Sequence, residues 1–107
     1  MSYDQNFEKF ISLIKQNFNP LKLLLFGSRA WDLASKSSDY DVLVLSDRKS
    51  KSNYQAYEIL NKCHPGNISI DLLVRSPEEI QERLNKEDPF FKKIMDQGIV
   101  LYERNSR

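Results

Sequence analysis

Hydrophobic residues near the N-terminus follow the spacing of one helix face. Phe7, Phe10, Ile11, Ile14 and Phe18 are three or four residues apart. Ser2 and Gln5 have the spacing of a capping box, and Pro20 disfavours helical geometry at the residue before it. The pattern therefore predicts an amphipathic helix over about residues 3–18.

Continuous aliphatic runs farther along the chain predict the buried strands of a small sheet. The runs cover residues 21–26, 40–45, 68–74 and 99–102. Each run is bounded by residues that favour turns or helix starts, such as Gly27-Ser28 and Ser46-Asp47. Four strands are therefore expected.

Polar residues between these runs mark further helices. A second capping box, from Ser52 to Gln55, predicts a helix, and Ser76 and Asp88, each followed by proline, predict two more. A short helix of two turns is expected from Ser28, and Gly98 is expected to cap the last helix. The order α-β-α-β-α-β-α-α-β predicts an α/β or α+β fold with a small sheet.

Length and composition limit the classes of protein that fit. The 107 residues suit one small domain over residues 1–107, with its core at about 20–103 after the N-terminal helix. Sixteen basic against 15 acidic residues leave a formal charge of +1, which argues against binding duplex nucleic acid. Cys63 is the single cysteine, and the longest apolar run, 23–26, cannot span a membrane. With no signal-peptide pattern at the N-terminus, we expect a cytoplasmic protein.

Three aspartates form the first half of a candidate site. Asp39 and Asp41 are two residues apart at the start of a strand, so their carboxylates face the same side. Adjacent carboxylates repel and need a cation, for which Mg²⁺ is the default because it prefers oxygen ligands. Asp71 lies within the next apolar strand, where a carboxylate is costly to bury unless it is paired or binds metal. The alternative for Asp71 alone is an edge-strand residue that points to solvent. If these two strands are neighbours, the three acids form a triad.

The pair Gly27-Ser28 forms the second half. Glycine allows a phosphate to approach the backbone, and the amides of a following helix favour an anion. The pair can act together with Asp39 and Asp41 only if the end of the first strand lies beside the start of the second. We therefore expect these two strands to run antiparallel.

These residues together resemble a known superfamily. Gly27-Ser28, the Asp39-x-Asp41 pair and Asp71 closely resemble the DNA polymerase β-like nucleotidyltransferases, over about residues 20–103. The short chain looks like the minimal nucleotidyltransferases (MNT), whose partners are HEPN-domain proteins. The sequence departs from the family pattern at Trp31-Asp32, where many members continue Gly-Ser-Arg-Ala-Arg-Gly.

The resemblance implies a fold and an activity. The fold is a small mixed sheet flanked by helices, and the reaction transfers AMP from ATP to a hydroxyl group. For the MNT group it implies an antitoxin that adenylylates a tyrosine of a HEPN ribonuclease toxin. Asp39 and Asp41 would bind two Mg²⁺ ions, Asp71 would bind the catalytic ion and help to deprotonate the hydroxyl, and Gly27, Ser28 and Arg29 would contact the triphosphate.

Two other functions remain open. The chain could neutralise its partner sterically without catalysis, or it could transfer a nucleotide to a small molecule or an RNA end. Several residues have a structural interpretation first: Trp31 and Phe90-Phe91 as packing groups, Cys63 as a core residue and His64 as an exposed turn residue. The basic run 48–51 is most simply a solvated loop, with contact to polyphosphate or an acidic partner as the alternative.

Overall fold

The computed structural model describes residues 3–31 and 39–105. Helices and strands follow one another there in nearly the predicted order: α1 (Gln5–Phe18), β1 (Lys22–Phe26), β2 (Tyr40–Leu45), α2 (Ser52–Cys63), β3 (Ile70–Arg75), α3 (Pro77–Asn85), α4 (Pro89–Gln97) and β4 (Ile99–Glu103). The α+β class and the mixed sheet are confirmed.

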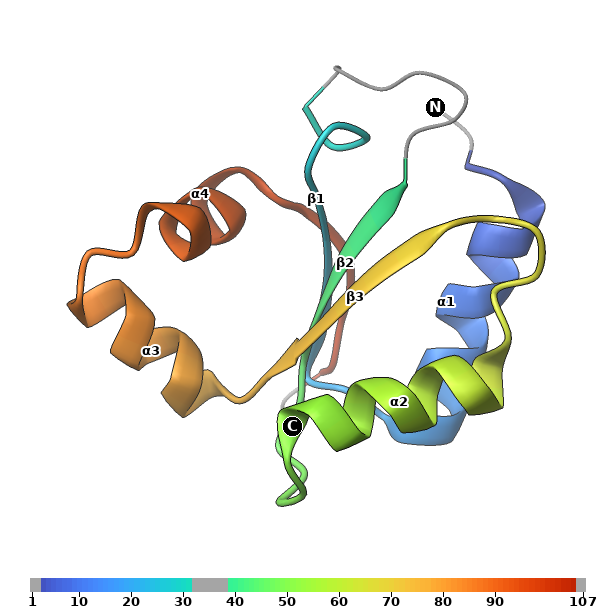
Figure 1. Ribbon diagram of the computed structural model, residues 1–107, viewed down its shortest axis with the longest axis horizontal. Coiled ribbons are helices and arrows are strands. Elements are labelled where there is room, and N and C mark those ends of the chain that lie inside the picture. The colour runs from blue at the N-terminus through green and yellow to red at the C-terminus, as the bar shows by residue number, and fades with distance from the viewer. Residues whose placement is uncertain (1–2, 32–38, 106–107) are drawn as a thin grey trace.

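The strands form one sheet in the order β3-β2-β1-β4 (Figure 1). β1 runs antiparallel to both β2 and β4, as expected for the first pair, whereas β2 and β3 run parallel and are joined through α2. The turn after β1 therefore lies at the same end of the sheet as the start of β2. The starts of β2 and β3 share that end because the two strands are parallel.

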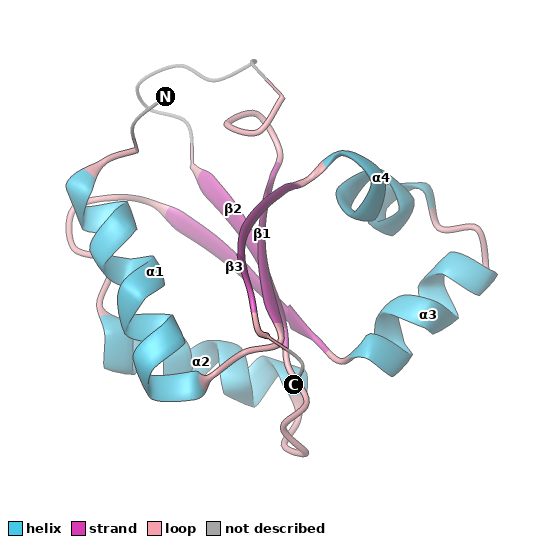
Figure 2. Cartoon of the chain, turned by 180° about the vertical axis from the view of Figure 1, so that it is seen from behind, coloured by secondary structure: helices cyan, strands magenta, loops and turns pink. Residues whose placement is uncertain are grey.

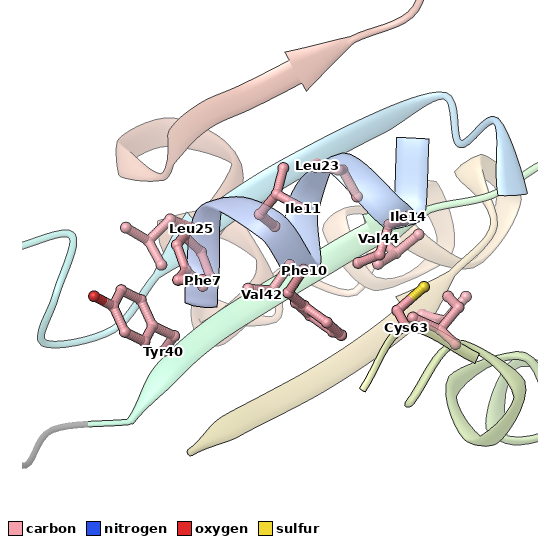
Figure 3. Close-up of a cluster of buried hydrophobic side chains, with 12 residues drawn as sticks. Phe7, Phe10, Ile11, Ile14, Leu23, Leu25, Tyr40, Val42, Val44 and Cys63 are labelled. Carbon is pink, nitrogen blue, oxygen red and sulfur yellow. The ribbon is translucent and has the colours of Figure 1, made fainter. Parts of the chain in front are cut away.

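Helices cover both faces of the sheet (Figure 2). Successive strand residues point to opposite faces, so Val42 and Val44 of β2 pack on the side of α1 and α2, while Leu43 and Leu45 pack on the side of α3 and α4. Figure 3 shows the first of these clusters, in which Phe7 and Phe10 of α1 are 1% and 0% exposed. Burial on both faces explains why the strands are continuous apolar runs rather than alternating ones.

The helix starts confirm some of the predicted caps and correct others. Ser76 and Glu79 form the predicted capping box of α3, and the Asp88 carboxylate caps α4. α1 begins at Gln5 with Asp4 as its cap; Ser2 lies outside the described residues. The second predicted capping box was wrong, because Lys51 precedes α2 with no side-chain cap.

The chain differs from the expectation at Gly98 and in the turn after Ser28. Gly98 follows α4 with φ −67°, so it is not a left-handed cap, although its amide donates to the Ile94 carbonyl at 2.8 Å. After Ser28 the described chain makes a single turn, in which the Trp31 amide donates to the Gly27 carbonyl at 3.1 Å. The remainder of the predicted helix, to residue 34, lies outside the described residues. No helix in the described part of the chain is long and apolar enough to cross a membrane.

Candidate active site

Two of the three predicted acids are cross-strand partners. Asp41 is the second residue of β2 and pairs with Asp71, the second residue of β3, in the parallel register. Because paired residues of neighbouring strands point to the same face, both carboxylates face the side of the sheet covered by α3 and α4. The predicted adjacency of these two strands is confirmed.

Asp71 is an edge-strand residue that faces solvent, which was one of the two alternatives for this carboxylate. Asp71 is exposed and Asp41 is half-buried, because β3 is the edge strand of the sheet and its start is not covered. Because Asp71 is exposed, its carboxylate needs no partner to offset a cost of burial. Its position opposite Asp41 is what links it to the site.

Gly27 brings the backbone of the first turn against the Asp41 carboxylate. Phe26, the last residue of β1, pairs with Asp41, and Gly27 follows it with φ +75°. A Cβ atom at Gly27 would lie 2.1 Å from Oδ2 of Asp41. Glycine is therefore required twice, for the left-handed backbone and for the space that the carboxylate occupies.

The charges of Asp71 and Asp39 act on the Asp41 carboxyl. Burial, followed by the charges of Asp71 and Asp39, raises the pKa of the Asp41 carboxyl above its ordinary value. Asp39 lies just before β2 and is exposed. The site therefore carries three carboxylates whose mutual repulsion is only partly screened by water.

A divalent cation fits the donor chemistry of these residues. Carboxylate oxygens are the ligands that Mg²⁺ prefers, and a cation between them would offset the repulsion that raises the pKa of Asp41. Within residues 3–31 and 39–105, no group of three His, Cys, Asp or Glu side chains is already arranged to hold a metal ion.

Arg29 lies over the ring of Tyr40. Its guanidinium carbon lies 4.1 Å from the centre of the Tyr40 ring, which itself stacks on Phe7 at 4.0 Å on the α1 side of the sheet (Figure 3 shows both rings). Tyr40 and Asp41 are consecutive in β2, so their side chains point to opposite faces. The contact of Arg29 with a triphosphate stays a prediction.

Trp31 connects the turn after β1 to α4. Its indole N–H donates to the Gln97 carbonyl at 3.0 Å, and the Lys93 ammonium lies 4.3 Å from the centre of its ring. The indole packs against the apolar cluster between the sheet and α3–α4, as its interpretation as a packing group predicts. Trp31 thus holds the turn that contains Gly27 and Ser28 in place.

The ring of Phe90 lies beside the candidate site, in contact with Phe26. Its ring meets Phe26, the residue paired with Asp41, edge to face at 5.7 Å, yet Phe90 is 49% exposed. The interpretation of Phe90-Phe91 as packing groups is confirmed for the buried Phe91, and Phe90 packs against Phe26 and Phe91 while half of its surface stays exposed. Sequence analysis missed Phe90 as a site residue because only the fold brings the start of α4 next to the end of β1.

The remaining candidates have structural roles or lie elsewhere. Cys63 is 0% exposed in the core and burial raises the pKa of its thiol, and His64 is exposed, as predicted. The basic run 48–51 follows the far end of β2, so it cannot reach a phosphate held at Gly27.

Comparison with known proteins agrees with this geometry. The family model described as "Polymerase beta, Nucleotidyltransferase" matches residues 8–107. The chain belongs to this nucleotidyltransferase family. Its fold is similar to the crystal structure of a protein from Sulfolobus solfataricus described as a candidate nucleotidyltransferase, with a TM-score of 0.57 and 19% identity over 98% of this chain and 93% of that one. No protein with a curated description is significantly similar in sequence.

Membership of the family relates the carboxylates and the glycine turn to one reaction, nucleotidyl transfer. Nucleotidyl transfer needs a place for a triphosphate and a cluster of acids for divalent metal. In this nucleotidyltransferase the turn at Gly27 and the pair Asp41 and Asp71 meet at one end of the sheet.

Proposed function

We propose that the chain is an Mg²⁺-dependent protein adenylyltransferase. It transfers AMP from ATP to a tyrosine hydroxyl of a partner HEPN ribonuclease toxin and so acts as an antitoxin. The observation that carries the transferase part is the contact of the Gly27 backbone with the Asp41 carboxylate, opposite Asp71. The protein acceptor rests on the resemblance to the minimal nucleotidyltransferases.

The residues divide into a metal-binding and a phosphate-binding group. Asp39 and Asp41 would hold two Mg²⁺ ions, and Asp71 would hold the ion nearer the acceptor. Bound there, the ions would supply positive charge that offsets the charge developing on the attacking and leaving oxygens. The backbone at Gly27 and the Ser28 hydroxyl would donate hydrogen bonds to the triphosphate.

In the proposed transfer, one bond to the α-phosphorus forms as another breaks, and Asp71 accepts the proton. The tyrosine oxygen forms a bond to the α-phosphorus of ATP, and the bond from that phosphorus to the oxygen bridging to the β-phosphate breaks. Pyrophosphate leaves with the bonding electrons, and the hydroxyl proton passes to a carboxylate oxygen of Asp71. Asp71 is exposed, so an acceptor can reach it from solvent.

The openness of the site supports a large acceptor. The carboxylate of Asp71 and the ring of Phe90 are both exposed at the rim, and Phe90 has half of its surface free for contact. A protein partner that positions its own tyrosine would supply the missing orientation.

Intact mass spectrometry of the co-purifying partner tests the proposal. The complex isolated from its host is incubated with Mg²⁺ and ATP, and the same is done with the Asp39→Asn/Asp41→Asn variant. We expect the partner to gain one or more AMP units with the wild type and none with the variant. Fragmentation then identifies the modified residue.

The other outcomes distinguish the alternatives. A partner that binds tightly and is neutralised equally well by the variant would show a steric antitoxin and refute adenylylation. Transfer of AMP to RNA ends or to a small hydroxyl compound, with no protein modified, would keep the enzyme and replace the acceptor. If the variant still transfers AMP, Asp39 and Asp41 are not needed for the reaction and do not belong to the site.

A further inference from the structure

A basic hollow lies at the end of the sheet opposite the three acids. It has a volume of about 760 Å³ and is lined by the loop after β2, the first turn of α2 and residues that follow β3. Its cationic residues are Arg48, Lys49, Lys51, Arg75 and Arg83. From Asp41 to Leu45 is four residues of β2, so the hollow is separated from the acids by roughly 13 Å of strand.

The positive charge of this basic hollow is only partly offset within the described chain, by the Glu79 carboxylate in its wall, which interacts with the charge of Arg75. None of its five cationic side chains forms an ion pair with a carboxylate among residues 3–31 and 39–105. The acid of the same loop, Asp47, is bound by Arg104 at 3.0 Å, and the acid in the wall, Glu79, accepts hydrogen bonds from the Ser76 amide and the Ser52 hydroxyl, both at 2.8 Å. Both nearby acids are therefore already engaged.

A buried glutamine holds the loop in shape. Gln55 is 4% exposed, accepts from the Ser46 hydroxyl at 2.7 Å, and donates to the Ser50 carbonyl at 2.5 Å and to the Arg48 carbonyl at 3.5 Å. These bonds fix the backbone that carries Arg48 and the neighbouring lysines. The cations are thus presented by an ordered loop rather than by a solvated tail.

We propose that this basic hollow binds the phosphate groups of a nucleoside polyphosphate or of a single-stranded RNA. Its volume lies in the range of small-ligand sites, roughly 300–1,000 Å³. The ring of Tyr54, 57% exposed in the wall, provides a surface on which a base can stack. This site is distinct from the transferase site and does not depend on the proposed function.

Phosphates fit the basic hollow better than an acidic protein segment does. Five cationic residues line one concavity, which suits a ligand that carries several charges within a few ångströms. The guanidinium groups of Arg48 and Arg75 also lie over the rings of Phe18 and Phe91, so the lysines and Arg83 are the more available cations. In an extended peptide, carboxylates on one side are about 7 Å apart, so few of them could enter together.

Chemical-shift mapping on the ¹⁵N-labelled protein tests the proposal. The probes are tripolyphosphate, ATP and a hexamer of adenosine RNA, each titrated in EDTA so that no divalent cation bridges them to the acids. We expect the amides of residues 48–54 and 75–83 to shift, with affinity falling as salt rises. Tighter binding of the RNA than of ATP would identify single-stranded RNA as the natural source of the phosphates. Tighter binding of ATP would identify a free nucleotide instead.

A pair of matched variants gives the decisive comparison. Lys49→Gln/Lys51→Gln removes two charges from the basic hollow, whereas Lys9→Gln/Lys92→Gln removes two exposed charges elsewhere. We expect the first to weaken RNA binding about fivefold or more and to lower the salt slope by about 2, and the second to change the slope much less. Because all four lysines are exposed, both variants are expected to fold, which the same spectra check.

Three results would overturn the proposal. Shifts confined to residues 27–31 and 39–41 would place phosphate at the acid site, and equal losses in the two double variants would show a diffuse charge effect. Binding of an oligoglutamate peptide with no binding of the phosphate probes would indicate an acidic protein partner instead. Loss of AMP transfer in the mass-spectrometry experiment would leave these shifts unchanged, so the two proposals fail separately.

Discussion

Replacing Gly27 with alanine tests the geometry on which the candidate active site rests. The residue has φ +75°, and its new Cβ would lie 2.1 Å from Oδ2 of Asp41. Forcing alanine into the left-handed region costs about 1 kcal/mol. Moving the Asp41 carboxylate off its preferred rotamer adds roughly 0.5–1.5 kcal/mol. The expected loss of unfolding free energy is therefore about 2 kcal/mol.

Gly66 provides a matched control for the backbone contribution. It has φ +78°, but a Cβ there would meet Asn6 no closer than 3.4 Å, which is ordinary contact. Gly66→Ala is therefore expected to cost about 1 kcal/mol, from the backbone alone. The difference between the two variants isolates the displacement of Asp41.

Urea denaturation followed by the fluorescence of the single tryptophan, Trp31, measures both losses. In thermal unfolding, each 1 kcal/mol should lower Tm by roughly 4–8 °C for a chain of this size. Gly27→Ala should also abolish AMP transfer, whereas Gly66→Ala should not. Equal stability losses in the two variants, or full transfer activity in Gly27→Ala, would refute the close approach of Gly27 to Asp41.

Three further predictions concern metal binding, capping and the loop after β2. Mg²⁺ should raise Tm of the wild type but not of Asp41→Asn, measured by calorimetry with EDTA as the reference. The Ser76 amide is the main cause that holds the pKa of Glu79 below its ordinary value of 4.5, so the stability that Glu79 adds is present above that pH and is lost as pH falls through the lower folded-state pKa. The deficit of Glu79→Gln at pH 7 is expected to be about 0.5 kcal/mol, because the glutamine oxygen can still accept from the Ser76 amide, and it should shrink in acid, while Glu78→Gln in the same turn shows no comparable deficit. Gln55→Leu should lower the free energy of unfolding by about 2 kcal/mol in urea denaturation, because it leaves the buried Ser46 hydroxyl and the Ser50 carbonyl without the Gln55 amide as their partner. A loss below about 0.5 kcal/mol would contradict the role of Gln55 in holding the loop after β2.

The sequence predicted those parts of the fold that depend on local pattern. Short apolar runs such as 40–45, bounded by turn residues, are typical of buried strands, and a capping residue followed by proline, as at Ser76 and Asp88, is typical of a helix start, so these elements were expected correctly. The antiparallel pairing of β1 and β2 was also predicted, because Gly27-Ser28 and Asp41 can act together in no other arrangement.

Features that depend on distant contacts were not predictable. The bond from Trp31 to the Gln97 carbonyl joins residues 66 apart, and Phe90 reaches the site only because α4 packs beside β1. Gln55 has the spacing of a capping residue, but its amide finds stronger partners in the carbonyls of the loop that precedes the helix. A local motif fails where the fold offers the same side chain a better set of bonds.

The direction of β1 explains why the acids and the basic hollow lie at opposite ends. In parallel sheets, ligands bind beyond the carboxyl ends of the strands, where the helices that follow begin. For β2 and β3 that end holds the basic hollow, beside the starts of α2 and α3. The acids lie at the amino ends instead, because antiparallel β1 delivers the Gly27 turn there. One reversed strand thus places the acids and the Gly27 turn at one end of this small sheet and the basic hollow at the other.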